Sequence, residues 1–188
     1  MKKYAISISS FDADLSNPTE VKAFAQHVLN ATDQIDILIN NTGTYEPGST
    51  YNEAEGQLEK MLNVNLFSAY HLTRALIGSM IKKKSGHIFN ICSIASLNAY
   101  PNGGSYSISK WALAGFSKNL REEMKPHHIK VTAVYPGATF TSSWDGMDID
   151  PKRILETSDI TKMIIAASDL SMQACVEDIV IRPQLGDL

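Results

Sequence analysis

The chain has little of several things that mark particular classes of protein. Its 188 residues include only two cysteines, Cys92 and Cys175, each among apolar neighbours, so we expect reduced core thiols rather than a disulfide framework or metal site. No apolar run is longer than a strand, which argues against a membrane-spanning helix. The 17 basic residues are balanced by 20 acidic ones, a net charge of −3, unlike the basic surface of a nucleic-acid-binding protein. We therefore expect a cytoplasmic protein with neither nucleic-acid nor membrane partners.

Glycine is missing from the first part of the chain, where Gly43 is the first of 11 glycines. Yet the opening stretch, MKKYAISISSFDADLS, begins like one β-strand and ends like another. Parallel strands need a connection of a dozen or more residues. The pattern of Met1–Ser16 therefore raises the question of how two strands could be joined there.

Strand-like runs alternate with helical patterns along the rest of the chain. One helix is expected to begin after Asn17, because Asn17 can cap it and Pro18 suits its first position. The other predicted helices cover 53–83, 106–125 and 159–167, and the predicted strands cover 35–39, 87–92, 129–135 and 177–182. This alternation predicts a single α/β domain with a Rossmann-type doubly wound parallel sheet covered on both faces.

Ligands of such sheets bind beyond the carboxyl ends of the strands. Ser93 follows one predicted strand, and Tyr106 and Lys110, four residues apart, share a face of the next predicted helix. An ammonium can lower the pKa of a nearby phenol by roughly one to three units, which makes tyrosine a usable general acid or base. A serine hydroxyl can donate a hydrogen bond to a carbonyl oxygen that gains charge.

Each of these residues also has a plainer interpretation. A Tyr-x-x-x-Lys pair alone is most often a solvated helix face. Asn40 could simply cap the end of a strand, Asn65 could be a polar helix residue, and Asp14 could be a turn residue. The order of the motifs is more specific than any one of them, because Asn-Asn-x-Gly, Ser, Tyr-x-x-x-Lys and Pro-Gly follow successive strands.

The ordered set resembles the short-chain dehydrogenase/reductase family over nearly the whole chain. The matching motifs are Asn40-Asn41-Thr42-Gly43, with Thr where the family has Ala, Asn63-Val64-Asn65, Ser93, Tyr106, Lys110, and Pro136-Gly137 with Thr141. The resemblance implies an NAD(P)-dependent oxidoreductase that acts on a small carbonyl compound or alcohol. It also implies a homodimer or homotetramer, with Trp111 and Phe116 in core or dimer packing. The segment 179–187, together with 136–144, is most similar to the sepiapterin-reductase-like branch, with the 3-ketoacyl-reductase-like branch as the alternative. This resemblance favours NADP slightly over NAD.

The resemblance also assigns roles. Tyr106 exchanges a proton with the carbonyl oxygen, Lys110 lowers the pKa of Tyr106 and holds the nicotinamide ribose, Ser93 orients the carbonyl, and Asn65 fixes a water in a proton relay. The implied cofactor-binding residues are Asp14, Leu15, Asn40, Gly43, Tyr106, Lys110, Pro136, Gly137, Thr139 and Thr141. The substrate loop is expected at 142–157, where Trp144 and Met147 are candidate lining residues.

One family motif has no counterpart. A turn of the pattern Thr-Gly-x-x-x-Gly-x-Gly should follow the first strand and hold the pyrophosphate at a helix N-terminus. Met1–Ile6 is similar to the family's first strand and Phe11–Ser16 to the end of its third, so we infer that the intervening block is absent between about residues 6 and 9. Either the protein lacks this block, or the protein contains it and the consecutive residue numbers simply skip it. An intact mass of 20.7 kDa would indicate deletion, whereas roughly 45–55 further residues would add about 5 kDa.

Two functions remain open on this evidence. One is an active oxidoreductase with a complete set of Asn65, Ser93, Tyr106 and Lys110. The alternative is a truncated, non-catalytic family member that dimerises or binds a partner. A serine hydrolase that uses Ser93 is excluded, because the chain has no Gly-x-Ser-x-Gly elbow and no histidine in a credible position.

Overall fold

The computed structural model describes residues 7–141, 144, 146 and 148–187. Four strands form one sheet in the order β1-β2-β3-β4, and each neighbouring pair is parallel. Their bounds are β1 Ile37–Asn40, β2 Gly86–Ile91, β3 Ile129–Pro136 and β4 Asp178–Ile181. The register places Ile37 opposite His87, Gly86 opposite Ile129 and Ala133 opposite Asp178. The predicted single α/β domain with a parallel sheet is confirmed.

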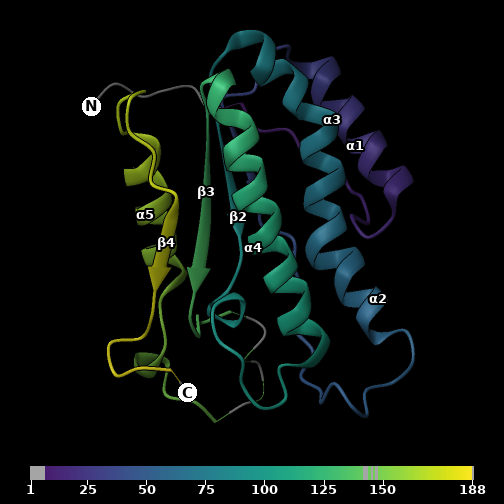
Figure 1. The fold of residues 1–188 in the computed structure, drawn as a ribbon, viewed down its shortest axis with the longest axis vertical. Coiled ribbons are helices and arrows are strands. Elements are labelled where there is room, and N and C mark those ends of the chain that lie inside the picture. Colours follow the sequence, from purple (N-terminus) through teal and green to yellow (C-terminus); the bar gives the residue numbers. More distant parts are fainter. Residues whose placement is uncertain (1–6, 142–143, 145, 147, 188) are drawn as a thin grey trace.

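Helices lie on both faces of this sheet (Figure 1). Their bounds are α1 Pro18–Ala31, α2 Gln57–Leu62, α3 Ser68–Lys83, α4 Gly104–Met124 and α5 Thr157–Ser168. Along β3, Val131 belongs to a core cluster with residues of α1, α3 and α4, whereas Val134 belongs to a cluster with residues of α5. This alternation follows from the two-residue period of a strand. Ile37 and Ile39 of β1 lie on the same face of the sheet as Val134. Each is 46% exposed, so this face is poorly covered at β1.

The start of α1 follows from its sequence. The Asn17 side chain accepts a hydrogen bond from the Thr19 amide at 2.9 Å, and Pro18 occupies the first helical position. A helix N-terminus leaves several backbone N–H donors without partners. The Asn17 side chain accepts from one of them, and Pro18 has no N–H to satisfy. Val21 and Ala25, four residues apart, are the buried positions of this helix. The predicted cap of this helix is confirmed.

The second predicted helix differs from the expectation. It does not begin at Glu53 but at Gln57, after Gly56, whose φ of 83° lies in the left-handed region. A π-helix at Asn63–Phe67 then separates α2 from α3. The helix also does not run unbroken to Lys83, because a π-helix adds a residue to one turn. The other predicted elements agree with the structure to within two residues, and Glu156 holds the N-cap position of α5.

The segment before α1 corrects another expectation. Phe11–Ser16, taken from the sequence as the end of a strand, forms no strand. Instead the Phe11 ring packs on Phe24 and His27 of α1, with centroid distances of 5.9 and 4.9 Å. Within the described ranges no strand lies beyond β1, so the backbone of this segment has no neighbour to pair with. The other half of the opening pattern, Met1–Ile6, lies outside the described residues.

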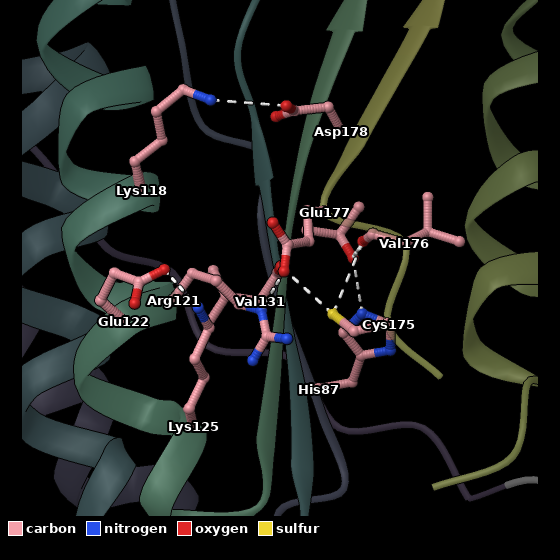
Figure 2. Close-up of polar contacts among 11 residues, drawn as sticks. His87, Lys118, Arg121, Glu122, Lys125, Val131, Cys175, Val176, Glu177 and Asp178 are labelled. Atoms are coloured by element: carbon pink, nitrogen blue, oxygen red, sulfur yellow. Dashed lines mark hydrogen bonds and ion pairs between the residues drawn. The ribbon is translucent and has the colours of Figure 1, made fainter. Parts of the chain in front are cut away.

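Ion pairs join α4 to the start of β4 (Figure 2). Arg121 lies 3.0 Å from Glu177, and Lys118 lies 3.4 Å from Asp178. In the described part of the chain, no helix is long and apolar enough to cross a membrane, and no cluster of potential metal ligands is present. Cys92 and Cys175 are both free thiols.

Candidate active site

The candidate site lies where the parallel strands end. The arrowheads of β3 and β4 point to the lower edge of the molecule in Figure 1, where the N-terminal end of α4 also lies. Asn40 ends β1, Ser93 follows β2 and Pro136 ends β3. The topology therefore brings three of the predicted segments to one edge of the sheet.

The structure places Ser93 and Tyr106 close together, and their catalytic roles stay predictions. Ser93 begins a short 3-10 turn and accepts a hydrogen bond from the Ala95 amide at 3.1 Å. It also lies close enough to the phenol of Tyr106, in the first turn of α4, to lower the pKa of that phenol. A hydroxyl and a phenol that lie this close can both bind one carbonyl oxygen.

The acidity of Tyr106 differs from the expectation. Burial raises the pKa of the Tyr106 phenol above its ordinary value, more than the hydrogen bond from Ser93 lowers it. The Lys110 ammonium, expected to lower this pKa, instead donates to the Ile91 carbonyl oxygen at 2.9 Å. It lies 6.0 Å from the centroid of the Tyr106 ring. In this structure Tyr106 is therefore a neutral phenol at neutral pH, ready to donate a proton.

Lys110 is a buried cation with unused donors. It is only 5% exposed, and burial lowers the pKa of its ammonium to about 8. An ammonium has three N–H donors, and the Ile91 carbonyl is its one hydrogen-bond acceptor among the described residues. A Cβ on Gly43 would lie 3.2 Å from Lys110 Nζ. The missing side chain of this glycine therefore lets the loop after β1 pass close to the ammonium.

Asn65 ties the loop after β1 to α4. Its Oδ1 accepts from the Thr44 amide at 2.8 Å, and its Nδ2 donates to the Thr44 carbonyl at 3.1 Å and to Ser109 Oγ at 2.9 Å. The side chain is fully buried in the π-helix. Its amide is thus committed to protein partners, and its assignment to a water relay stays a prediction.

Asn40 is the first member of a buried polar network. Its Nδ2 donates to Thr73 Oγ1 at 2.9 Å and to Asn90 Oδ1 at 2.7 Å, and Asn90 donates to Ser117 Oγ at 2.8 Å. The network connects β1, β2, α3 and α4 and so fixes the edge of the sheet that bears the site. Asn90 and Ser117 were missed in the sequence, although a polar residue inside an apolar strand was a usable signal.

A groove of about 240 Å³ lies beside the end of β1. Leu15 lines it together with Asn40, Asn41 and Thr42, so two of the segments predicted to bind the cofactor meet there. The neighbouring Asp14 is exposed and held in a turn. Its carboxylate accepts from the Ser16 amide at 2.9 Å and from the Ser16 hydroxyl at 2.7 Å, and these bonds lower its pKa.

The segment after β3 has a tightly packed start. The Gly137 amide donates to the Ile181 carbonyl at 2.7 Å, and a Cβ on Gly137 would lie 2.9 Å from Pro183 Cδ. Thr139 Oγ1 donates back to the Gly137 carbonyl at 2.9 Å. Their predicted cofactor contacts, like those of Pro136 and the exposed Thr141, remain predictions.

The proposed substrate loop is described in part. Trp144 is partly buried within it, whereas Met147 and Ser142 lie outside the described residues. An aromatic wall beside Tyr106 was not anticipated from the sequence. The Tyr45 ring stands edge-on to Tyr106 with centroids 4.8 Å apart. Tyr100 is close enough that both neighbours add to the effect of burial in raising its pKa.

The sequence model of short chain dehydrogenases matches residues 1–150. The chain belongs to this family. A sepiapterin reductase from Chlorobaculum tepidum is 30% identical over 94% of the chain and 72% of its own length. A diacetyl reductase, (S)-acetoin forming, from Staphylococcus epidermidis is 30% identical over 80% of the chain and 59% of its own length.

A solved structure is similar over the same extent. The crystal structure of a metagenomic short-chain oxidoreductase in complex with NADP is 31% identical and covers 94% of this chain and 74% of that chain, with a TM-score of 0.78. The chain thus spans between about three fifths and three quarters of the length of these three family members.

Proposed function

We propose that this chain is an NAD(P)-dependent carbonyl reductase or alcohol dehydrogenase in which Tyr106 is the general acid or base. The observation that carries the proposal is the arrangement of Lys110 beside Ser93 and Tyr106. A buried ammonium with two donors unused by described residues, which the loop at Gly43 approaches closely, could bind the paired hydroxyls of a ribose. Burying such a cation without further partners is otherwise unfavourable.

The residues divide the reaction as follows. A bound reduced nicotinamide supplies the hydride that a carbonyl carbon accepts. Tyr106 donates its proton to the carbonyl oxygen, so that an alcohol forms, and the reverse steps oxidise an alcohol. Ser93 holds the carbonyl oxygen against the phenol. Because burial raises the pKa of Tyr106, the protonated form dominates at neutral pH, which supports the reductive direction.

NADP is the cofactor that the comparisons favour slightly, since the 31% identical oxidoreductase was crystallised with NADP. The groove beside Leu15 and Asn40–Thr42 is an apolar and amide-lined space suited to an adenine ring. Two relatives are named for the reduction of sepiapterin and of diacetyl. Both are small carbonyl compounds, and they are the natural first substrates to assay.

The alternative is a shortened family member that binds a partner without catalysis. Its support is the lack of any glycine before Gly43, where the pyrophosphate-binding turn of the family belongs. Trp111, which is 50% exposed on α4, suits the helix-paired homodimer or homotetramer proposed for either case.

A fluorescence titration with NADPH on a chain of verified mass separates the two functions. Saturable binding supports the oxidoreductase, and the absence of binding refutes it in favour of the non-catalytic member. Turnover of sepiapterin and diacetyl is measured next in wild type and in Tyr106→Phe. We expect the variant to bind NADPH normally and to lose turnover by at least about 100-fold, as removal of an acid catalyst does. Persistent turnover would show that Tyr106 is not the acid.

A further inference from the structure

Alternate residues at the start of α4 are serines bound to different parts of the molecule. Ser107 Oγ donates to the Ala95 carbonyl at 2.8 Å, and Ser109 is the partner of Asn65. Ser105, only 1% exposed, is bound by Glu53, which lies 52 residues earlier in the chain. Tyr106 lies between these anchors. The orientation of its phenol therefore depends on how firmly this first turn is held.

The Glu53 carboxylate closes the N-terminus of α4. Its Oε1 and Oε2 accept from the Ser105 amide at 2.9 and 3.2 Å, and Oε2 also accepts from the Ser105 hydroxyl. The amides of the first helical turn have no partners within the helix, and a negative charge there interacts favourably with the helix dipole. Glu53 supplies both the acceptor and the charge from a distant loop.

Two glycines make room for this carboxylate. A Cβ on Gly104, whose φ is +40°, would lie 2.0 Å from Glu53 Oε1, and a Cβ on Gly48 would lie 2.6 Å from the same atom. The Gly48 amide also donates to the Asn102 carbonyl at 3.1 Å, and Ser49 Oγ donates to Asn102 Oδ1 at 2.8 Å. The loop that bears Glu53 is thus fastened to the loop that leads into α4.

Resting on the proposed function above, we propose that Glu53 is a positioning residue for Tyr106. It fixes the first turn of α4, so that the phenol stays in contact with Ser93. Its carboxylate also places a negative charge at the N-terminal end of the helix whose first turn bears Tyr106. The nearby Glu46 has a different role, because its carboxylate is paired with Lys60 and Gln57 at the side of α2.

The charge and the acceptor of Glu53 can be tested separately. Glu53→Gln keeps an oxygen that can accept from the Ser105 amide but removes the charge, whereas Glu53→Ala removes both. Loss of the charge leaves the helix dipole unbalanced, which favours the phenolate, so the pKa of Tyr106 should fall in both variants. Glu55→Gln is the matched control, because Glu55 is an exposed carboxylate two residues away.

The experiment has one activity readout and one that needs no turnover. With NADPH and diacetyl, Glu53→Ala should lower kcat between about tenfold and a hundredfold, as small misplacements of catalytic groups do, while KM for NADPH changes less than about threefold. Glu53→Gln should recover most of kcat and shift the Tyr106 limb of the pH profile to lower pH. Glu55→Gln should match wild type.

The second readout is the ring-carbon NMR signal of Tyr106 in the cofactor-free protein, assigned with Tyr106→Phe. It should move and titrate at lower pH in Glu53→Gln but not in Glu55→Gln. An unchanged Tyr106 signal, or a Glu53→Ala variant with wild-type kcat, would overturn the proposal. Should wild type bind no NADPH, the proposed function fails, and the NMR signal still decides the role of Glu53. If Glu53→Ala does not fold, Glu53→Gln decides alone.

Discussion

His87 links the stability of this protein to pH, and its surroundings allow the effect to be calculated. The imidazole is 5% exposed, stacks on Phe89 with centroids 3.9 Å apart and places Nε2 2.7 Å from Thr132 Oγ1. Thr132 donates its own proton to the Val176 carbonyl, so it accepts from Nε2–H. Nδ1 is buried without a described partner.

Protonation of Nδ1 would place an uncompensated positive charge in this site. Burial, and then the positive charges of Lys130 and Arg121, lower the pKa of His87 from 6.5 to about 4. The unfolded chain therefore binds a proton that the folded chain does not between pH 6.5 and 4, and stability falls as pH falls through that window. The difference corresponds to about 3 kcal/mol in full, of which about 2 kcal/mol is lost between pH 7 and pH 5.

Urea unfolding of wild type and His87→Phe at half-unit steps from pH 7 to pH 5 measures this contribution. We expect the free energy of unfolding of the variant to fall by about 2 kcal/mol less than that of wild type over this range. His128→Asn is the control, because His128 is exposed and Asn accepts its positive φ of 58°. If wild type and His87→Phe lose equal stability over this range, the reasoning about His87 is refuted.

Three further substitutions test the packing, each by urea unfolding at pH 7. Asn90→Ala should cost about 2 kcal/mol because it leaves Asn40 Nδ2 short of a buried acceptor; a loss below about 0.5 kcal/mol would show that this hydrogen bond does not stabilise the fold. Leu113→Ala, at a site 1% exposed, should cost about 3 kcal/mol, and a neutral result would mean that this core is loosely packed. Lys118→Ala should change stability by less than about 0.5 kcal/mol, since its ion pair with Asp178 is largely exposed; a larger loss would show that the pair is not a surface pair.

Local chemistry made most of the fold predictable. Asn17 and Pro18 marked the start of α1 because capping depends on neighbouring residues, and Pro136-Gly137 marked the end of β3. The meeting of Ser93 and Tyr106 could also be foreseen, since parallel strands bring their carboxyl ends to one edge. Such features are encoded within a few residues or follow from topology.

What could not be predicted depends on contacts between distant segments. The π-helix around Asn65 inserts one residue without a sequence signal. Glu53 does not belong to the helix expected from the sequence. Its carboxylate instead binds Ser105, which comes 52 positions later in the chain. Lys110 shares a helix face with Tyr106 as expected, but the carbonyl of Ile91 on the neighbouring strand determines where its ammonium points.

The two isoleucines exposed on β1 have a thermodynamic consequence. Full burial of an isoleucine side chain contributes about 1.5–3 kcal/mol, and Ile37 and Ile39 each keep 46% of their surface in water. Together they forgo about 2 kcal/mol of burial free energy. Because domains of this size are stable by only about 5–15 kcal/mol, a change that covered both side chains would raise the melting temperature by several degrees.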